Sequence, residues 1–145
     1  KLKKIGAKGL EKAINLIESG KVIAEKQDES LVTFVKPISK EQEVIDWSDT
    51  KENIYNKIRG LNPFPGALSY YDDQIIKVYL SEKIDKEYDG EYGEIVEILN
   101  KKGPVVKVKN GGIILKEVKF QGKKSQSGID IINGRKIILN SKFGK

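Results

Sequence analysis

The sequence predicts a mainly β protein with short helices, preceded by an N-terminal helix and a linker. Up to residue 20, apolar residues recur at helical spacing. Beyond residue 66 they recur in short runs with a period of two, separated by Gly, Asn and Asp turn signals. Roughly five or six such runs with two short helices are typical of a small β-barrel, and we expect an OB-like Greek-key barrel.

The composition narrows the classes of function. The chain has 145 residues, which suits one domain with an extension. No apolar run approaches the roughly 20 residues of a membrane span, so we expect no membrane partner. The sequence has no cysteine and no histidine, which removes disulfides, thiolate ligands and the commonest general base and metal ligand. We therefore expect no metal, and a cytoplasmic protein, since no signal-peptide pattern follows the basic first residues.

The chain is expected to be a piece of a longer protein or a processed product, because it contains no methionine. We divide it into three parts: residues 1–20 with a helix over 2–19, a linker over 21–43, and a domain over 44–145. Gly20 is a suitable helix stop. Within the linker, Leu31 to Val35 has strand composition without clean alternation.

A second helix is expected to begin near Ser48 or Asp49, and Asp49 with Glu52 has the spacing of a capping box. Its apolar face comprises Ile54, Tyr55, Ile58 and Leu61. Trp47, just before the cap, is expected to anchor the core. The cation of Arg59 suits the end of this helix, although contact with a ligand is equally open.

The segment after this helix, residues 62–66, is called here the proline corner. Each proline fixes its own φ and pushes the preceding residue towards extended geometry, while Gly66 permits a positive φ. Two interpretations stand: a connector whose Phe64 caps the core, or a loop with a direct functional role. The candidate residues of this signature loop are Arg59, Asn62, Pro63, Phe64, Pro65 and Gly66.

The strands and turns follow in order. Expected strands are 67–71, 75–80, 92–99, 105–109 and 113–120, with a hairpin at Asp72-Asp73 and an acidic loop over 81–91. Ser127 is expected to cap a short helix, Gly128 to Asn133, which Gly134 ends. The last segment, from Arg135 to Lys145, is expected to fray.

Charge is concentrated at the end of the chain. Residues 101–145 carry twelve basic and two acidic residues, net +10, whereas residues 61–100 are net −6. Such concentration favours a polyanion partner, and the alternative is a lysine-rich coat without a partner. Alternating lysines are expected to form one groove that contacts phosphates. The candidate nucleic-acid-binding residues are the groove lysines Lys107, Lys109, Lys116, Lys119, Lys123 and Lys124, followed by Arg135 and Lys136.

Several segments together resemble the C-terminal half of the methionyl-tRNA formyltransferase family. They are residues 27–33, 45–48 and 58–67, and the closing set Gly122-Lys123-Lys124, Ser127, Asp130 and Asn133-Gly134. The resemblance implies a parent enzyme that transfers a formyl group from 10-formyltetrahydrofolate to the methionyl amine of initiator tRNA. It implies that 1–20 is the last helix of a Rossmann-like catalytic domain, and that 44–145 is an OB-like domain that binds the acceptor arm of initiator methionyl-tRNA.

The resemblance also implies limits. The family's catalytic Asn, His and Asp have no matching positions here, so the chain is expected to have no cofactor and no transferase activity alone. The apolar face of helix 2–19 is expected to dock on the barrel or on a second copy, which leaves the oligomeric state open. Two alternatives remain: the C-terminal domain of a formyltransferase acting on a small molecule (nucleotide sugar or folate), and a stand-alone basic binding module. The basic C-terminal segment favours the tRNA-binding interpretation.

Overall fold

The structure is a computed structural model that describes residues 2–144, and it falls into two units that meet between Lys36 and Pro37. The first unit contains α1 (Leu2–Glu18) and the 3-10 helix η1 (Glu29–Leu31). The helices of the second unit are α2 (Lys40–Glu43), α3 (Lys51–Leu61) and α4 (Gly128–Asn133). Its strands are β1 (Ala67–Tyr71), β2 (Gln74–Ile84), β3 (Ile95–Leu99), β4 (Gly103–Val108), β5 (Gly111–Phe120) and β6 (Gln126–Ser127).

In the first unit, α1 forms where the apolar spacing predicts a helix, and none of its residues is buried. Gly20 ends it with a φ of +66°, and the backbone N–H of Lys21 bonds the carbonyl of Leu16 at 3.1 Å. The strand composition of Leu31 to Val35 does not produce a strand. Instead the Asp28 side chain accepts a bond from the Ser30 N–H and starts η1, because a local Asx cap competes with extended structure.

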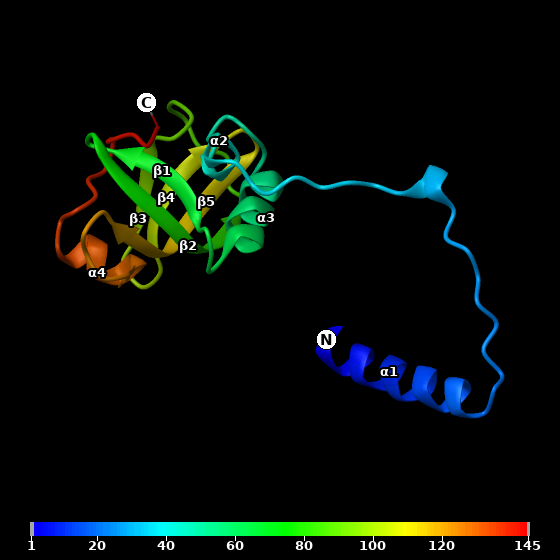
Figure 1. Cartoon of the computed structure of the whole chain (residues 1–145). Coiled ribbons are helices and arrows are strands. Elements are labelled where there is room, and N and C mark those ends of the chain that lie inside the picture. Colours follow the sequence, from blue (N-terminus) through cyan, green and yellow to red (C-terminus); the bar gives the residue numbers. More distant parts are fainter. Residues whose placement is uncertain (1, 145) are drawn as a thin grey trace. The chain divides into compact units, whose positions relative to one another are not determined.

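The second unit is built on one antiparallel sheet of six strands, in the order β1-β2-β5-β4-β3, with β6 paired to β5 (Figure 1). Helix α3 packs mainly on β2, and α4 packs on β4 and β5. The prediction of a mainly β domain with short helices is therefore confirmed. Strand pairing leaves the sheet open, and the OB-like Greek-key barrel stays a prediction.

The C-terminal segment borders both outer strands of this sheet. Isolated bridges join Phe143 to Tyr71 of β1, and Lys142 to Glu94 just before β3. The backbone N–H of Ile95 also bonds the Ser141 carbonyl at 2.8 Å. Because Phe143 is buried in the core, the prediction that this segment frays is wrong for its described residues.

The core lies between the sheet, α3 and this C-terminal segment. Trp47 is 4% exposed, and its ring centroid lies 5.5 Å from that of Phe143. Its indole N–H donates to the hydroxyl of Ser69 at 2.9 Å, which satisfies a buried donor. Trp47 therefore anchors the core, as the sequence predicts.

Helix α3 buries Ile54, Ile58 and Leu61, the apolar face expected from its spacing. The N-cap is Thr50, however, whose hydroxyl accepts from the Asn53 N–H at 3.3 Å. Asp49 is not the cap because its carboxylate is taken by the N–H of Thr50 at 2.7 Å and by the Asn53 amide. The predicted capping box of Asp49 with Glu52 is therefore wrong, and the N-cap lies one residue later, at Thr50.

The turns agree closely with the predicted ones. Asp72 and Asp73 have φ values of 50° and 57°, as expected for a two-residue hairpin between β1 and β2. Ser127 caps α4 in a capping box with Asp130, and Gly134 ends it. Strand β2 continues to Ile84, so the acidic loop begins later than predicted, and β3 begins later as well.

Candidate nucleic-acid interface

The proline corner leads from α3 into β1. Both of its X-Pro bonds, Asn62-Pro63 and Phe64-Pro65, are cis, and Asn62 is extended with φ −83° and ψ 136°. Gly66 has a φ of +84°, and its N–H bonds the Leu61 carbonyl at 2.9 Å. A Cβ added to Gly66 would lie 2.8 Å from Cε1 of Tyr79, so the corner lies directly against the outer face of β2.

Phe64, at the tip of this corner, is 88% exposed. The interpretation of Phe64 as a cap on the core is therefore wrong. Leu61 and Ala67, which flank the corner, are the residues that are buried in the core at this point. The corner instead presents Phe64 to solvent on the outer side of the sheet.

A hollow of about 330 Å³, called here the proline-corner cleft, lies beneath this ring. Its lining comprises Pro63, Phe64, Pro65, Ile75, Lys77, Tyr79, Lys119, Phe120 and Gln121. On its floor, Lys77 of β2 stands directly opposite Lys119 of β5 in the strand register. Like charges in opposite positions of neighbouring strands are unfavourable by themselves, so the pair is a cost unless anions neutralise it.

The two lysines differ in their partners. The ammonium of Lys77 donates to the carbonyl of Pro65 and lies 3.5 Å from a carboxylate oxygen of Glu43. Lys119 is exposed and forms no hydrogen bond or ion pair with any residue of the described range. Lys77 therefore fastens the proline corner to the sheet, whereas the Lys119 charge is available to a ligand.

Phe120 connects this cleft to a second, smaller hollow of about 160 Å³. The ammonium groups of Lys123 and Lys136 both border that hollow, and each lies 5.9 Å from the centroid of the Phe120 ring. Lys136 also donates to the side chain of Gln126 at 2.6 Å. Three candidate lysines, Lys119, Lys123 and Lys136, thus gather around one aromatic residue.

The other candidate residues lie elsewhere. Lys107 is paired with Gly112 near the first residue of β5, and its ammonium donates to the carbonyl of Tyr88. Lys109 is exposed at the same end. Because seven residues of extended strand separate Gly112 from Lys119, this end is roughly 25 Å from Lys119. The structure therefore does not bring the six predicted lysines into one groove.

Lys116, Lys124 and Arg135 complete the predicted set. Lys116 is half-buried near the middle of β5, where the pKa of Glu82 is lowered chiefly by the Lys102 hydrogen bond and also by Lys116. Lys124 and Arg135 are exposed. Contact of any of these residues with RNA stays a prediction.

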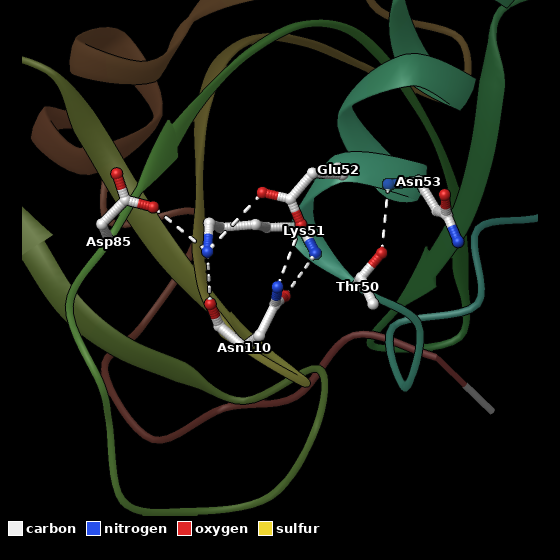
Figure 2. Close-up of polar contacts among 6 residues, drawn as sticks. All are labelled: Thr50, Lys51, Glu52, Asn53, Asp85 and Asn110. Carbon is white, nitrogen blue, oxygen red and sulfur yellow. Dashed lines mark hydrogen bonds and ion pairs between the residues drawn. The ribbon is translucent and has the colours of Figure 1, made fainter.

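The Gly111 end of β5 is held by internal polar contacts (Figure 2). The Asn110 side-chain oxygen accepts from the backbone N–H of Lys51 at 2.8 Å, and its amide donates to Glu52 at 2.9 Å. The Lys51 ammonium bonds the Asn110 carbonyl at 2.7 Å and lies 3.1 Å from Asp85. The Asn110 hydrogen bond lowers the pKa of Glu52, and the Asp85 hydrogen bond raises the pKa of Lys51.

Five members of the cleft were not predicted as site residues from the sequence, namely Ile75, Lys77, Tyr79, Phe120 and Gln121. The signal for three of them exists, because Ile75, Lys77 and Tyr79 alternate with the buried Ile76 and Val78 along β2. Sequence reasoning singled out the basic C-terminal segment and did not assign a partner to this face. Arg59, in the last turn of α3, donates to the side chain of Asn56 at 3.1 Å and does not line the cleft.

Two features are absent from the residues that the structure describes. None of the helices within 2–144 has the length and apolar character needed to cross a membrane. The same residues contain no group of three or more Asp, Glu, His or Cys side chains placed to hold a metal ion.

Comparison with known proteins gives the family. Residues 37–136 match the family described as formyl transferase, C-terminal domain. The methionyl-tRNA formyltransferase of Fusobacterium nucleatum is 48% identical over 144 residues, covering 99% of this chain and 46% of that protein. That of Bacillus cytotoxicus is 40% identical over 145 residues, covering 100% of this chain and 46% of that protein. The chain thus spans about half the length of the curated relatives it matches.

A solved structure shares the fold at low identity. HypX from Aquifex aeolicus, in complex with tetrahydrofolic acid, aligns with a TM-score of 0.69 and 15% identity, covering 92% of this chain and 23% of that chain. This likeness concerns the fold alone. From the matched domain, we conclude that the chain belongs to the formyl transferase family and is similar to the C-terminal part of methionyl-tRNA formyltransferases.

Proposed function

We propose that this chain is the tRNA-binding C-terminal part of a methionyl-tRNA formyltransferase. The observation that carries the proposal is the 48% identity to a protein of that name over 99% of the chain. The net charge of +10 over residues 101–145 supports it, since tRNA is a polyanion. Lys119 and Lys123 support it further, because their ammonium groups have no ion-pair partner in the described chain.

In the whole protein, we assign the transfer of a formyl group from 10-formyltetrahydrofolate to the methionyl amine of initiator tRNA, in the cytoplasm. Residues 1–20 then end the catalytic domain, 21–43 form the linker, and 44–145 form an OB-like domain that holds the acceptor arm. The lysines of this domain bind phosphates and supply affinity that is largely independent of base sequence.

The chain alone is proposed to be inactive in formyl transfer. It contains no histidine, so the catalytic set implied by the family resemblance is incomplete. Incubation of the 145-residue chain with 10-formyltetrahydrofolate and methionyl-tRNA should give no formylmethionyl-tRNA above the rate without protein. Formylation at a rate proportional to the chain's concentration would contradict this part of the proposal.

The binding part is tested by a salt titration of the chain with initiator and elongator tRNA. We expect binding to both RNAs, with the logarithm of the association constant falling steeply against that of the salt concentration. The Lys123→Glu and Lys124→Glu double variant should reduce that slope by about two, one unit for each lost phosphate contact.

Absence of binding to either tRNA at about 50 mM salt would overturn the proposal, since phosphate contacts are strongest at low salt. The lysines would then be a solubilising coat. The C-terminal domain of a formyltransferase acting on a small molecule would become the better assignment.

A further inference from the structure

Phe64 is an unusual surface residue. Within the described part of the second unit, no other large apolar side chain is as exposed as its 88%. An exposed aromatic ring loses the free energy of burial, so a ring displayed over a cleft indicates a ligand more strongly than an isolated surface leucine does. Its neighbours in the cleft are a second aromatic ring, Tyr79, and the lysine pair Lys77 and Lys119.

The ring is displayed on a fixed support. Pro63 and Pro65 restrict the backbone on both sides of it, and Gly66 lies in contact with Tyr79 below. Lys77 donates to the carbonyl of Pro65 and so fastens the corner from the sheet side. A ligand that contacts Phe64 therefore orders little of the loop when it binds, which favours affinity.

Lysines predominate among the charged side chains beside the ring, although Asp72 lines the neighbouring hollow together with Lys123 and Lys136. Lys119 lies on the cleft floor, and Lys123 lies beyond Phe120 at the neighbouring hollow. Among the described residues, Glu43 is the only carboxylate that forms an ion pair with a lysine of the cleft, and its partner is Lys77. A flat, apolar surface next to unpaired cations is the combination by which proteins bind unpaired nucleotides, through base stacking and phosphate contacts.

We propose that the proline-corner cleft takes one unstacked base of the bound RNA, with Phe64 stacked on the base and Lys119 and Lys123 on the adjacent phosphates. This inference rests on the proposed tRNA binding and adds a single-stranded nucleotide site to it. Lys77 is a positioning residue in this arrangement, because its ammonium is already held by Pro65 and Glu43. The cleft is expected to favour unpaired over duplex RNA, whose bases are stacked inside the helix.

The test uses the 145-residue chain and a short single-stranded RNA that carries one 2-aminopurine, a base whose fluorescence is quenched by stacking. Binding should quench this fluorescence, and Phe64→Ala should abolish the quenching. Phe64→Ala should also weaken the RNA affinity about tenfold, within the range measured for the loss of one base–aromatic stack. Phe64→Trp should retain both signals.

The matched control is Phe34→Ala, because Phe34 is a phenylalanine of the first unit that is 93% exposed. This variant should bind and quench like the unchanged chain. Lys119→Gln provides a second arm, since it should lower the salt slope by about one and retain the quenching. Far-ultraviolet circular dichroism reports whether each variant is folded, and the fluorescence of the buried Trp47 does so for the variants that add no second tryptophan.

The outcomes separate the two proposals. If RNA binds with a steep salt slope but is not quenched, or if Phe64→Ala and Phe34→Ala behave alike, the cleft inference is overturned and the proposed tRNA binding stands. If neither tRNA nor the labelled RNA binds at about 50 mM salt, both are overturned. Tighter binding of a duplex of the same length would likewise overturn the cleft inference.

Discussion

The two ends of β5 both carry lysines, but the surroundings of those lysines differ. At the Gly111 end, the ammonium groups of Lys51 and Lys107 are held by carbonyl oxygens of the same chain. Lys109 is exposed there and precedes Asn110, whose side-chain amide donates to Glu52. At the Phe120 end, the ammonium of Lys119 has no hydrogen-bond or ion-pair partner among residues 2–144, and Lys119 lines the same cleft as the exposed ring of Phe64. The comparison teaches that the net charge of a segment does not locate a binding surface. An unpaired ammonium group beside an exposed apolar side chain is the more specific indication.

The largest expected effect is a loss of stability on substitution of Gly66, the last residue of the proline corner. Gly66→Ala should lower the free energy of unfolding by about 2 kcal/mol, because alanine is strained at a φ of +84° and its Cβ would press on Tyr79. Chemical denaturation of the two proteins measures this difference.

The control for that prediction is Gly60→Ala in the last turn of α3. Gly60 has open space around it, so alanine there should stabilise the helix by about 0.5–1 kcal/mol. Equal effects of the two substitutions would show that the backbone of the corner is not restricted as described.

The next expected effect is a difference in tRNA affinity between variants at the two ends of β5. Lys119→Glu should weaken tRNA binding roughly tenfold, about 1.4 kcal/mol, whereas Lys109→Glu should change it less than about twofold. Both lysines are exposed and both substitutions change the net charge equally. Fluorescence anisotropy with labelled tRNA at fixed salt measures the two affinities. Equal losses would mean that overall charge, and not the cleft, determines binding.

At the Gly111 end, Asn110→Ala should destabilise the protein by about 1 kcal/mol, the usual effect of losing a side-chain bond to the first turn of a helix. The variant loses the bond to the Lys51 N–H and the bond to Glu52. Thermal unfolding measures the loss, and tRNA affinity should remain unchanged. Gln121→Ala, an exposed position at the opposite end, should leave stability unaltered.

The smallest expected effect is a dependence of the melting temperature on pH in the acidic range. The pKa values of Glu52 and Glu97 are lowered from the ordinary 4.5, chiefly by hydrogen bonds from Asn110 and Tyr88 respectively. Their stabilisation is therefore complete above pH 4.5 and is lost as the pH falls through the lower, folded-state values. Between about pH 6 and pH 3, the melting temperature of Glu52→Gln should fall less than that of the unchanged chain. Parallel curves would contradict this role of Glu52.

The elements that the sequence predicted well are those determined by contacts between residues close together in the chain. Helix α4 has its cap at Ser127 and its end at Gly134, because the capping box and the glycine act within one turn. The Asp72-Asp73 hairpin is equally local. The family resemblance was confirmed for a related reason, since its motifs are short and lie in a fixed order.

The candidate site was predicted only in part, because its geometry depends on distant residues. The partner of Lys107 is Tyr88, and that of Lys77 is Pro65, and neither pairing follows from periodicity. The exposure of Phe64 between the buried Leu61 and Ala67 follows from the path of the corner and not from the apolar pattern. The alternation of residues predicts that these lysines lie on the outer face of the sheet. It does not predict which of their ammonium groups are bonded by other groups of the same chain.

The C-terminal segment has a consequence for behaviour at high concentration. Outer strands present unpaired backbone groups that can pair with another molecule and begin aggregation. Here one short segment partly covers both outer strands, through the bridges Phe143–Tyr71 and Lys142–Glu94. Removing the residues after Asn140 should expose backbone groups of both outer strands and also takes the buried Phe143 out of the core, so the shortened chain should precipitate on mild warming.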